Sequence, residues 1–300
     1  MKKQAIALSL LTLAIAATVG CGNSTAVPTF TRVALLSNRV VVPVTSLYTA
    51  NLDGSNVTPI PFSTTNVWSL SNSADGKTLA FTANISSTRQ LWVSKSDGTG
   101  QKQLTTPSQP YWVRISPSGK KVTYDGYDGT TYHVFVINTD GTGNLDLTPT
   151  LPTNMSECYE PSFSADSSQI VFVCYSSTNN ANGIYTVNAD GTGTKTVEVR
   201  AAASWADYPY FTPDGKKVLF VGPSPGAKFS AVISVNRDGS AETVVVSPAD
   251  EFVVLNSNLF YESSCTSPLQ IFKAKLDGTN PVQVSDSSNN QDLYYPSSCN

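Results

Sequence analysis

The sequence predicts an all-β protein, a six-bladed β-propeller, and three observations lead to this prediction. An Asp-Gly pair recurs six times, 39 to 50 residues apart, beginning at Asp53, Asp97, Asp140, Asp190, Asp238 and Asp277. A short β-prone run such as Leu91–Val93 precedes each pair, and Asp-Gly between such runs is a strong hairpin signal. No repeat carries a long amphipathic helical pattern. Repeats of this length, with four short strands each, are typical of propeller blades.

Composition excludes several classes of protein. The chain has 300 residues, of which 40% are hydrophobic and 14% charged, and its formal net charge is −3. A nucleic-acid binder would carry a basic stripe, and a disordered chain would carry more charge. The single histidine excludes a catalytic His triad and a multi-His metal site. We therefore expect no cofactor, no metal and no nucleic-acid partner.

The N-terminus reads as an export signal. Lys2 and Lys3 precede an apolar run over 5–17, which is too short for a comfortable membrane span, and small residues lead up to Cys21. The segment resembles the bacterial lipobox, which implies cleavage after residue 20 and lipidation of Cys21. Thr18 departs from the leucine usual in that motif, and plain secretion is the alternative. We expect a signal peptide over 1–20, a lipidated linker over 21–28 and the propeller over 29–300. By resemblance to enterobacterial lipoprotein sorting, Gly22 after the cysteine implies the outer membrane, at its periplasmic face or the cell surface.

A second turn lies upstream of the Asp-Gly pair in most repeats, as in Pro213-Asp214-Gly215-Lys216. The segments Tyr208–Phe220 and Ile184–Gly193 resemble the WD40-like (PD40) repeats of the TolB propeller family. The resemblance covers nearly all of the mature chain and implies the propeller fold. TolB also carries an α/β domain before its propeller, for which this chain has no room. A role in the Tol–Pal system is therefore not carried over.

The first repeat looks incomplete. The run over 32–39 matches a second strand, and no inner strand precedes it. At the other end, 292–297 parallels the inner-strand run over 157–162. Because an open ring leaves unpaired edges, we expect the C-terminal strand to complete the first blade and close the ring. A loose tail is the alternative.

Four cysteines remain besides Cys21. Cys158 and Cys174 lie symmetrically about Asp166, at the centre of a predicted hairpin turn, so they should face each other and form a disulfide. Elimination would pair Cys265 with Cys299. The repeat alignment places these two on opposite faces, so whether they are bonded stays open.

Inner strands begin near one mouth of the central channel, and their leading residues are candidates for ligand binding. Aromatic side chains there stand beside carboxylates, a combination that suits a sugar, a peptide or a cationic group. Packing between blades is the alternative role. The candidate mouth residues are Trp68, Tyr111, Trp112, Glu157, Tyr159, Trp205, Asp207, Tyr208 and Tyr294.

Three weaker signals have plainer interpretations. The run over 125–129 (DGYDG) offers oxygen ligands but lacks calcium-loop spacing, so a glycine-rich turn is favoured. His133 has no second histidine or cysteine nearby and is expected to be a hydrogen-bonded structural residue. Asp207, Glu157 and Glu160 are acids of the type that glycosidases use in pairs. No catalytic residue is assigned, since the sequence carries no hydrolase, P-loop or metalloprotease motif.

The favoured function is a monomeric, lipid-anchored and non-catalytic scaffold. Its partner would be another envelope protein or a cell-wall or surface polymer, and lipid would be its only contact with the membrane. The alternative is a carbohydrate-active enzyme, a glycosidase or lyase with carboxylates at the channel mouth. An extracellular adhesion module is a third hypothesis.

Overall fold

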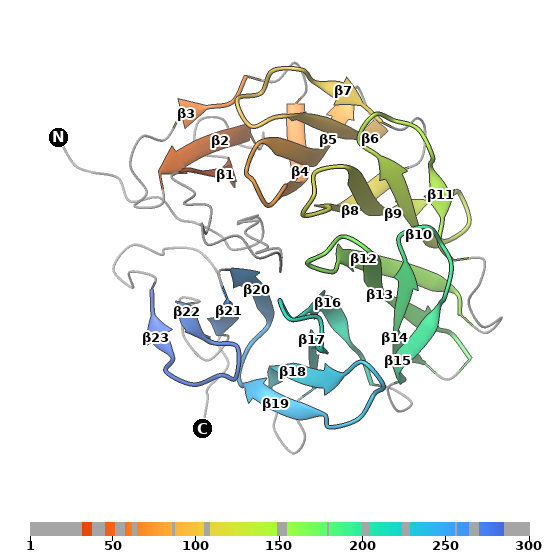
Figure 1. Cartoon of the computed structure of the whole chain (residues 1–300), viewed down its shortest axis with the longest axis vertical. Coiled ribbons are helices and arrows are strands. Elements are labelled where there is room, and N and C mark those ends of the chain that lie inside the picture. Colours follow the sequence, from red (N-terminus) through yellow and green to blue (C-terminus); the bar gives the residue numbers. More distant parts are fainter. Residues whose placement is uncertain are drawn as a thin grey trace.

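The computed structural model describes residues 32–37, 46–51, 58–61, 65–85, 88–104, 109–148, 155–178, 180–199, 204–223, 229–255, 257–263 and 270–284. These residues form six antiparallel sheets arranged around a central axis (Figure 1). The all-β propeller architecture is therefore confirmed. No helix of the described part is long and apolar enough to cross a membrane.

Five of the sheets are four-stranded blades in which consecutive strands pair in chain order. The inner strands lie nearest the axis in Figure 1 and the short outer strands lie at the rim. The blades are β4–β7 (Thr65–Asn72, Thr78–Ile85, Thr88–Lys95, Lys102–Gln103), β8–β11 (Gln109–Ile115, Lys121–Tyr127, Tyr132–Asn138, Leu145–Asp146), β12–β15 (Glu157–Phe163, Gln169–Ser176, Ala181–Asn188, Lys195–Val199), β16–β19 (Asp207–Phe211, Lys217–Pro223, Ser230–Asn236, Thr243–Val246) and β20–β23 (Glu251–Leu255, Asn258–Ser263, Gln270–Lys275, Val282–Gln283).

The sixth sheet shows that the prediction of six blades is wrong. It contains three strands, β1 (Arg32–Ser37), β2 (Ser46–Asn51) and β3 (Thr58–Pro59), so the described residues form five blades and not six. The six Asp-Gly turns led to the prediction of six blades. Each of these turns joins the two outer strands of a blade. Asp53-Gly54 therefore indicates outer strands and carries no information about an inner one. The segment 292–297, which was expected to close the ring, lies outside the described residues.

The core is divided into layers between neighbouring blades. On β13, Ile170 and Phe172 pack toward the preceding blade, while Val171 and Val173 pack toward the following one. Both faces of these second strands are thus buried, which explains why they are continuous apolar runs without the alternation of a half-exposed strand.

The recurring Asp-Gly turns pack closely against the preceding blade. Gly239 and Gly278 have φ of 81° and 80°, a conformation that glycine adopts without steric cost. A Cβ on Gly239 would lie 2.4 Å from the carbonyl oxygen of Val197 in the preceding blade, and a Cβ on Gly278 would lie 2.0 Å from that of Val245. Glycine is therefore required by close approach as well as by conformation.

The disulfide expected between Cys158 and Cys174 is present, with an S–S distance of 2.10 Å. It joins directly opposed residues of β12 and β13, and both cysteines are buried. Cys265 and Cys299 lie outside the described residues.

Candidate functional site

The inner strands β8, β12 and β16 share a break in their pairing that shapes the centre of the molecule. The register with the second strand shifts between Pro110 and Val113, between Tyr159 and Ser162, and between Asp207 and Tyr210. Such bulges re-aim side chains and release backbone N–H groups from the sheet. Glu160 and Tyr208, at matching positions of two bulges, have φ of 55° and 54°, which is an unusual conformation for these residue types.

Carboxylates bind the N–H groups that the bulges release. Asp125 accepts hydrogen bonds from the backbone N–H of Trp112 (2.6 Å) and of Glu160 (3.3 Å). Glu160 in turn accepts one from the backbone N–H of Tyr208 (2.6 Å). The Tyr208 hydroxyl donates to Glu251 at 3.3 Å. Four successive inner strands are therefore linked through three acidic side chains.

Burial sets the charge state of these acids. It raises the pKa of Asp125 to about 6, although two backbone N–H groups favour the ionised form. The pKa of Glu160 lies well above its usual value, first because of burial and then because of repulsion from Asp207. Burial also raises the pKa of Asp207 to about 6. Asp125 on β9 and Asp207 on β16 thus take up protons at about pH 6.

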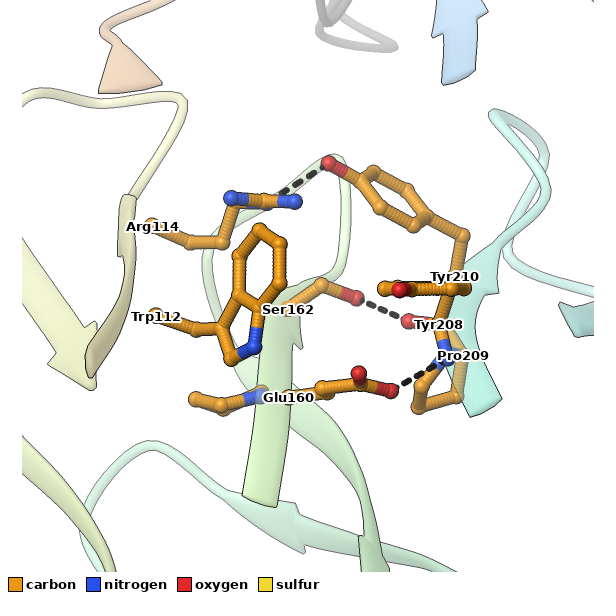
Figure 2. A pocket seen from close by; sticks show the side chains of 8 residues that line it. Trp112, Arg114, Glu160, Ser162, Tyr208, Pro209 and Tyr210 are labelled. Carbon is orange, nitrogen blue, oxygen red and sulfur yellow. Dashed lines mark hydrogen bonds between the residues drawn. The ribbon is translucent and has the colours of Figure 1, made fainter. Parts of the chain in front are cut away.

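A small pocket opens between β8, β12 and β16 (Figure 2). It encloses about 220 Å³, including space open to solvent. The rings of Trp112 and Tyr208 meet edge to face across it, with centroids 5.8 Å apart. The pocket is lined by Trp112, Arg114, Glu160, Pro161, Ser162, Tyr208, Pro209 and Tyr210.

Arg114 is held in a defined position beside these rings. Its Nε donates to the Tyr210 hydroxyl at 2.8 Å, and its Nη1 donates to the Val113 carbonyl at 3.0 Å (Figure 2 shows the Tyr210 bond). Its guanidinium carbon lies 5.8 Å from the Trp112 ring centroid and 5.7 Å from that of Tyr210. The pocket therefore offers aromatic surface and one guanidinium.

The predicted mouth residues fall into several groups. Trp112 and Tyr208 line the pocket, whereas Trp68 on β4 and Tyr111 on β8 flank Arg89, which lies on β6. Trp205 packs between two blades, and the Tyr159 hydroxyl accepts a hydrogen bond from Asn182. Glu157 is exposed and Asp207 is half-buried, each at the start of its strand. Tyr294 lies outside the described residues.

The candidate residues identified from the sequence did not include Arg89, Arg114, Tyr210 and Glu251. A usable signal existed for Arg114 and Tyr210, because each lies two residues after a predicted mouth residue, and alternate residues of a strand share a face. No signal existed for Arg89, which reaches Tyr111 of the next blade only through the fold.

Two of the three weaker sequence signals, His133 and the run over 125–129, are structural. His133 Nδ1 is hydrogen-bonded with Asp146 (2.9 Å) and Thr148 (2.6 Å). Asp128 accepts from the backbone N–H groups of Thr130 and Thr131, as in a turn, while Asp125 points into the inter-blade network. Within the described ranges, no three His, Cys, Asp or Glu side chains group as a metal site would require.

Comparisons with known proteins agree on the fold. No protein-family model and no curated protein matches the chain. Among solved structures, it is similar to a putative TolB from Agrobacterium tumefaciens (21% identity, TM-score 0.55, covering 67% of this chain and 75% of that one). It is also similar to TolB from Acinetobacter baumannii (14%, 0.64, 85% and 64%) and to oligogalacturonate lyase from Vibrio parahaemolyticus (12%, 0.63, 88% and 77%).

The chain therefore shares the β-propeller fold of these TolB structures. All the identities lie below the level at which activity is shared, and the chain spans 64% of the length of the Acinetobacter protein. Function must therefore be argued from the site.

Proposed function

We propose that this protein is an exported, lipid-anchored and non-catalytic scaffold. It would bind a segment of another envelope protein or of a cell-wall or surface polymer at the channel mouth. The observation that supports this most directly is the pocket between β8, β12 and β16, which presents the rings of Trp112 and Tyr208 beside the Arg114 guanidinium. Aromatic and arginine side chains in a concave site supply most of the binding energy at typical recognition surfaces.

The state of the carboxylates favours binding over catalysis. A general acid or base must be within reach of the proton it transfers to or from a substrate. Asp125 and the bonded oxygen of Glu160 are instead engaged by backbone N–H groups of adjacent inner strands. Their role is to hold the blades together.

The lipid anchor rests on Cys21 and the leader that precedes it. A short linker over 21–28 would keep the propeller near the membrane, so the partner would be another component of the same envelope. The chain would act as a monomer, because the ligand site is built within one chain.

One observation favours the alternative, a carbohydrate-active enzyme. Asp207 and Glu160 are neighbouring carboxyls, both with raised pKa, and Asp207 is only half-buried. A pair of acids whose environments raise the pKa is what glycoside chemistry uses. The similarity to an oligogalacturonate lyase is a similarity of fold, and it is the reason why the alternative includes a lyase.

Two measurements test this proposal, one of binding to an envelope component and one of oligosaccharide turnover. Photo-crosslinking from Trp112 in cells should capture an envelope component, and Arg114→Met with Tyr208→Ala should abolish that capture in a protein that still folds. Purified protein incubated with oligosaccharides should release no product. Turnover that disappears in Asp207→Asn would overturn the non-catalytic proposal and establish the enzyme.

A further inference from the structure

A second arginine lies between aromatic rings at the start of the inner strands. The guanidinium carbon of Arg89 lies 4.5 Å from the ring centroid of Trp68 and 4.0 Å from that of Tyr111. Trp68 and Tyr111 occupy matching positions of β4 and β8, so two neighbouring blades contribute the two rings. The arrangement fixes the guanidinium plane before any ligand arrives.

One donor of Arg89 has no acceptor among the described residues. Its Nε is buried and makes no hydrogen bond with any described residue, and Arg89 enters no ion pair within the described ranges. The carboxyl that acts on it electrostatically is Asp125, which is itself buried and bound by backbone N–H groups. Tyr111 also interacts with the guanidinium, through its ring and a side-chain hydrogen bond. A carboxylate would give the buried Nε an acceptor and match the planar fork of the guanidinium.

The surroundings of Arg89 suit a ring-shaped ligand. Trp68 is 53% exposed, which is unusual for so large an apolar side chain. Tyr111 continues the aromatic wall through an edge-to-face contact with Tyr132 at 5.3 Å, and Tyr132 contacts Tyr127 at 5.2 Å. An exposed indole accepts the C–H face of a sugar ring. The Tyr127 hydroxyl donates to the Gly129 carbonyl and Tyr132 is hydrogen-bonded with Tyr111, so these tyrosines form a fixed aromatic wall.

The same combination occurs again one step along the mouth. Arg114 lies beside the rings of Trp112 and Tyr210, and Trp112 directly follows Tyr111 on β8. Two sites that share strand β8, each an arginine flanked by two aromatic rings, suit a polymer that repeats a ring and a carboxylate.

We propose, resting on the scaffold function above, that the ligand is an acidic polysaccharide whose sugar residues carry carboxylates. A carboxylate binds Arg89 and its sugar ring packs against Trp68. A neighbouring sugar of the same chain engages Arg114 in the pocket. The site selects for uronate-type polymers over neutral ones because a neutral chain supplies no negative charge to the partly buried guanidinium of Arg89.

The test is calorimetric titration of the full folded protein with a polygalacturonate oligomer. Its matched control is the same oligomer with methyl-esterified carboxylates, and poly-L-glutamate of similar length tests an acidic peptide. We expect the esterified oligomer to bind at least about tenfold more weakly, because a charge-assisted bidentate contact is lost. Arg89→Lys and Trp68→Ala should each weaken binding of the acidic oligomer by a similar factor.

Arg237→Lys serves as the matched control variant. Arg237 also lies over an aromatic ring, that of Phe211 at 5.1 Å, but its contacts are with Gly215 and Gln169 at the opposite ends of the strands. This variant should bind the acidic oligomer like the wild type. Thermal unfolding of each variant verifies that it folds.

Each other outcome has a separate meaning. Equal binding of acidic and esterified oligomers, or tighter binding of poly-L-glutamate, overturns the polysaccharide assignment. Failure to bind any oligomer while crosslinking from Trp112 still captures a protein also overturns it and leaves the scaffold intact. Binding followed by cleavage of the oligomer supports the ligand class and overturns the non-catalytic function.

Discussion

The Glu160 carboxylate accepts a hydrogen bond from the backbone N–H of Tyr208 at 2.6 Å and thereby joins β12 to β16. Both residues adopt a left-handed backbone conformation at the bulge of their strand. The bulge at Tyr208 therefore depends on an acid supplied by the preceding blade, and the same residues line the pocket. Stability and the shape of the candidate site are coupled at this contact.

We expect Glu160→Ala to lower the free energy of unfolding by about 1–3 kcal/mol, because the N–H of Tyr208 loses its acceptor. Glu160→Gln keeps an amide oxygen at the same place and should cost less. Urea unfolding of both variants at one pH measures the difference. Equal losses for Ala and Gln would contradict the role of this hydrogen bond.

Stability should fall as pH rises from about 4.5 through 7. Burial, and then repulsion from Glu251 and Asp250, raises the pKa of Glu262 from 4.5 to about 7. When the pKa of an acid is higher in the folded than in the unfolded protein, the protonated acid stabilises the fold. This stabilisation is complete below the pKa of the unfolded protein and is lost as pH rises through the pKa of the folded protein. Asp125 and Asp207 contribute in the same direction, so Glu262→Gln should reduce the slope without abolishing it. It should add about 1 kcal/mol above pH 7, a figure smaller than the full shift because solvent screens the partly exposed group.

The control for this pH series is Asp97→Asn. Hydrogen bonds from Thr99 lower the pKa of Asp97, so it titrates below the window in question. This variant should keep the slope of the wild type. A Glu262→Gln slope indistinguishable from that of the wild type would show that Glu262 is not the group responsible.

Gly239→Ala should destabilise the protein more than Gly215→Ala does. Both glycines have positive φ, so each substitution costs about 1–2 kcal/mol in backbone strain. At Gly215 a Cβ would meet nothing within 4 Å, whereas at Gly239 it would lie 2.4 Å from the Val197 carbonyl oxygen. We expect an additional loss of about 1–3 kcal/mol from this overlap. Equal melting temperatures for the two variants would mean that the approach between the blades is not tight.

Removing the disulfide with Cys158→Ala and Cys174→Ala should cost about 3 kcal/mol, the amount typical of a loop near its 16-residue separation. Thermal unfolding with and without reductant measures the loss. Reductant should lower the melting temperature of the wild type toward that of the double variant. A double variant that melts with the wild type would contradict a stabilising role for the bond.

Cys21→Ser should release the protein from membranes, because the proposed lipid would be its only anchor. The measurement is detergent phase partitioning of cell fractions, together with metabolic labelling by a fatty-acid analogue. Cys265→Ser is the control and should keep the wild-type distribution. A Cys21→Ser protein that stays in the detergent phase would mean that Cys21 does not carry the anchor.

Local patterns in the sequence were sufficient for the all-β propeller class, the Asp-Gly hairpins and the Cys158–Cys174 pair. Each of these depends on residues close together in the chain, such as the aspartate whose carboxylate caps its own turn. Trp112 and Tyr208 were also identifiable as candidates, because each leads an inner strand.

Tertiary structure alone decided the number of blades and the chemistry of the site. An Asp-Gly turn reports the outer strands of a blade, so six turns did not establish six inner strands. Arg89 meets Tyr111 of the next blade, Arg114 meets Tyr210 two blades away, and Glu160 meets Tyr208. Contacts of this kind arise from closing blades around an axis, which brings residues distant in sequence within hydrogen-bond range and leaves no periodicity in the chain.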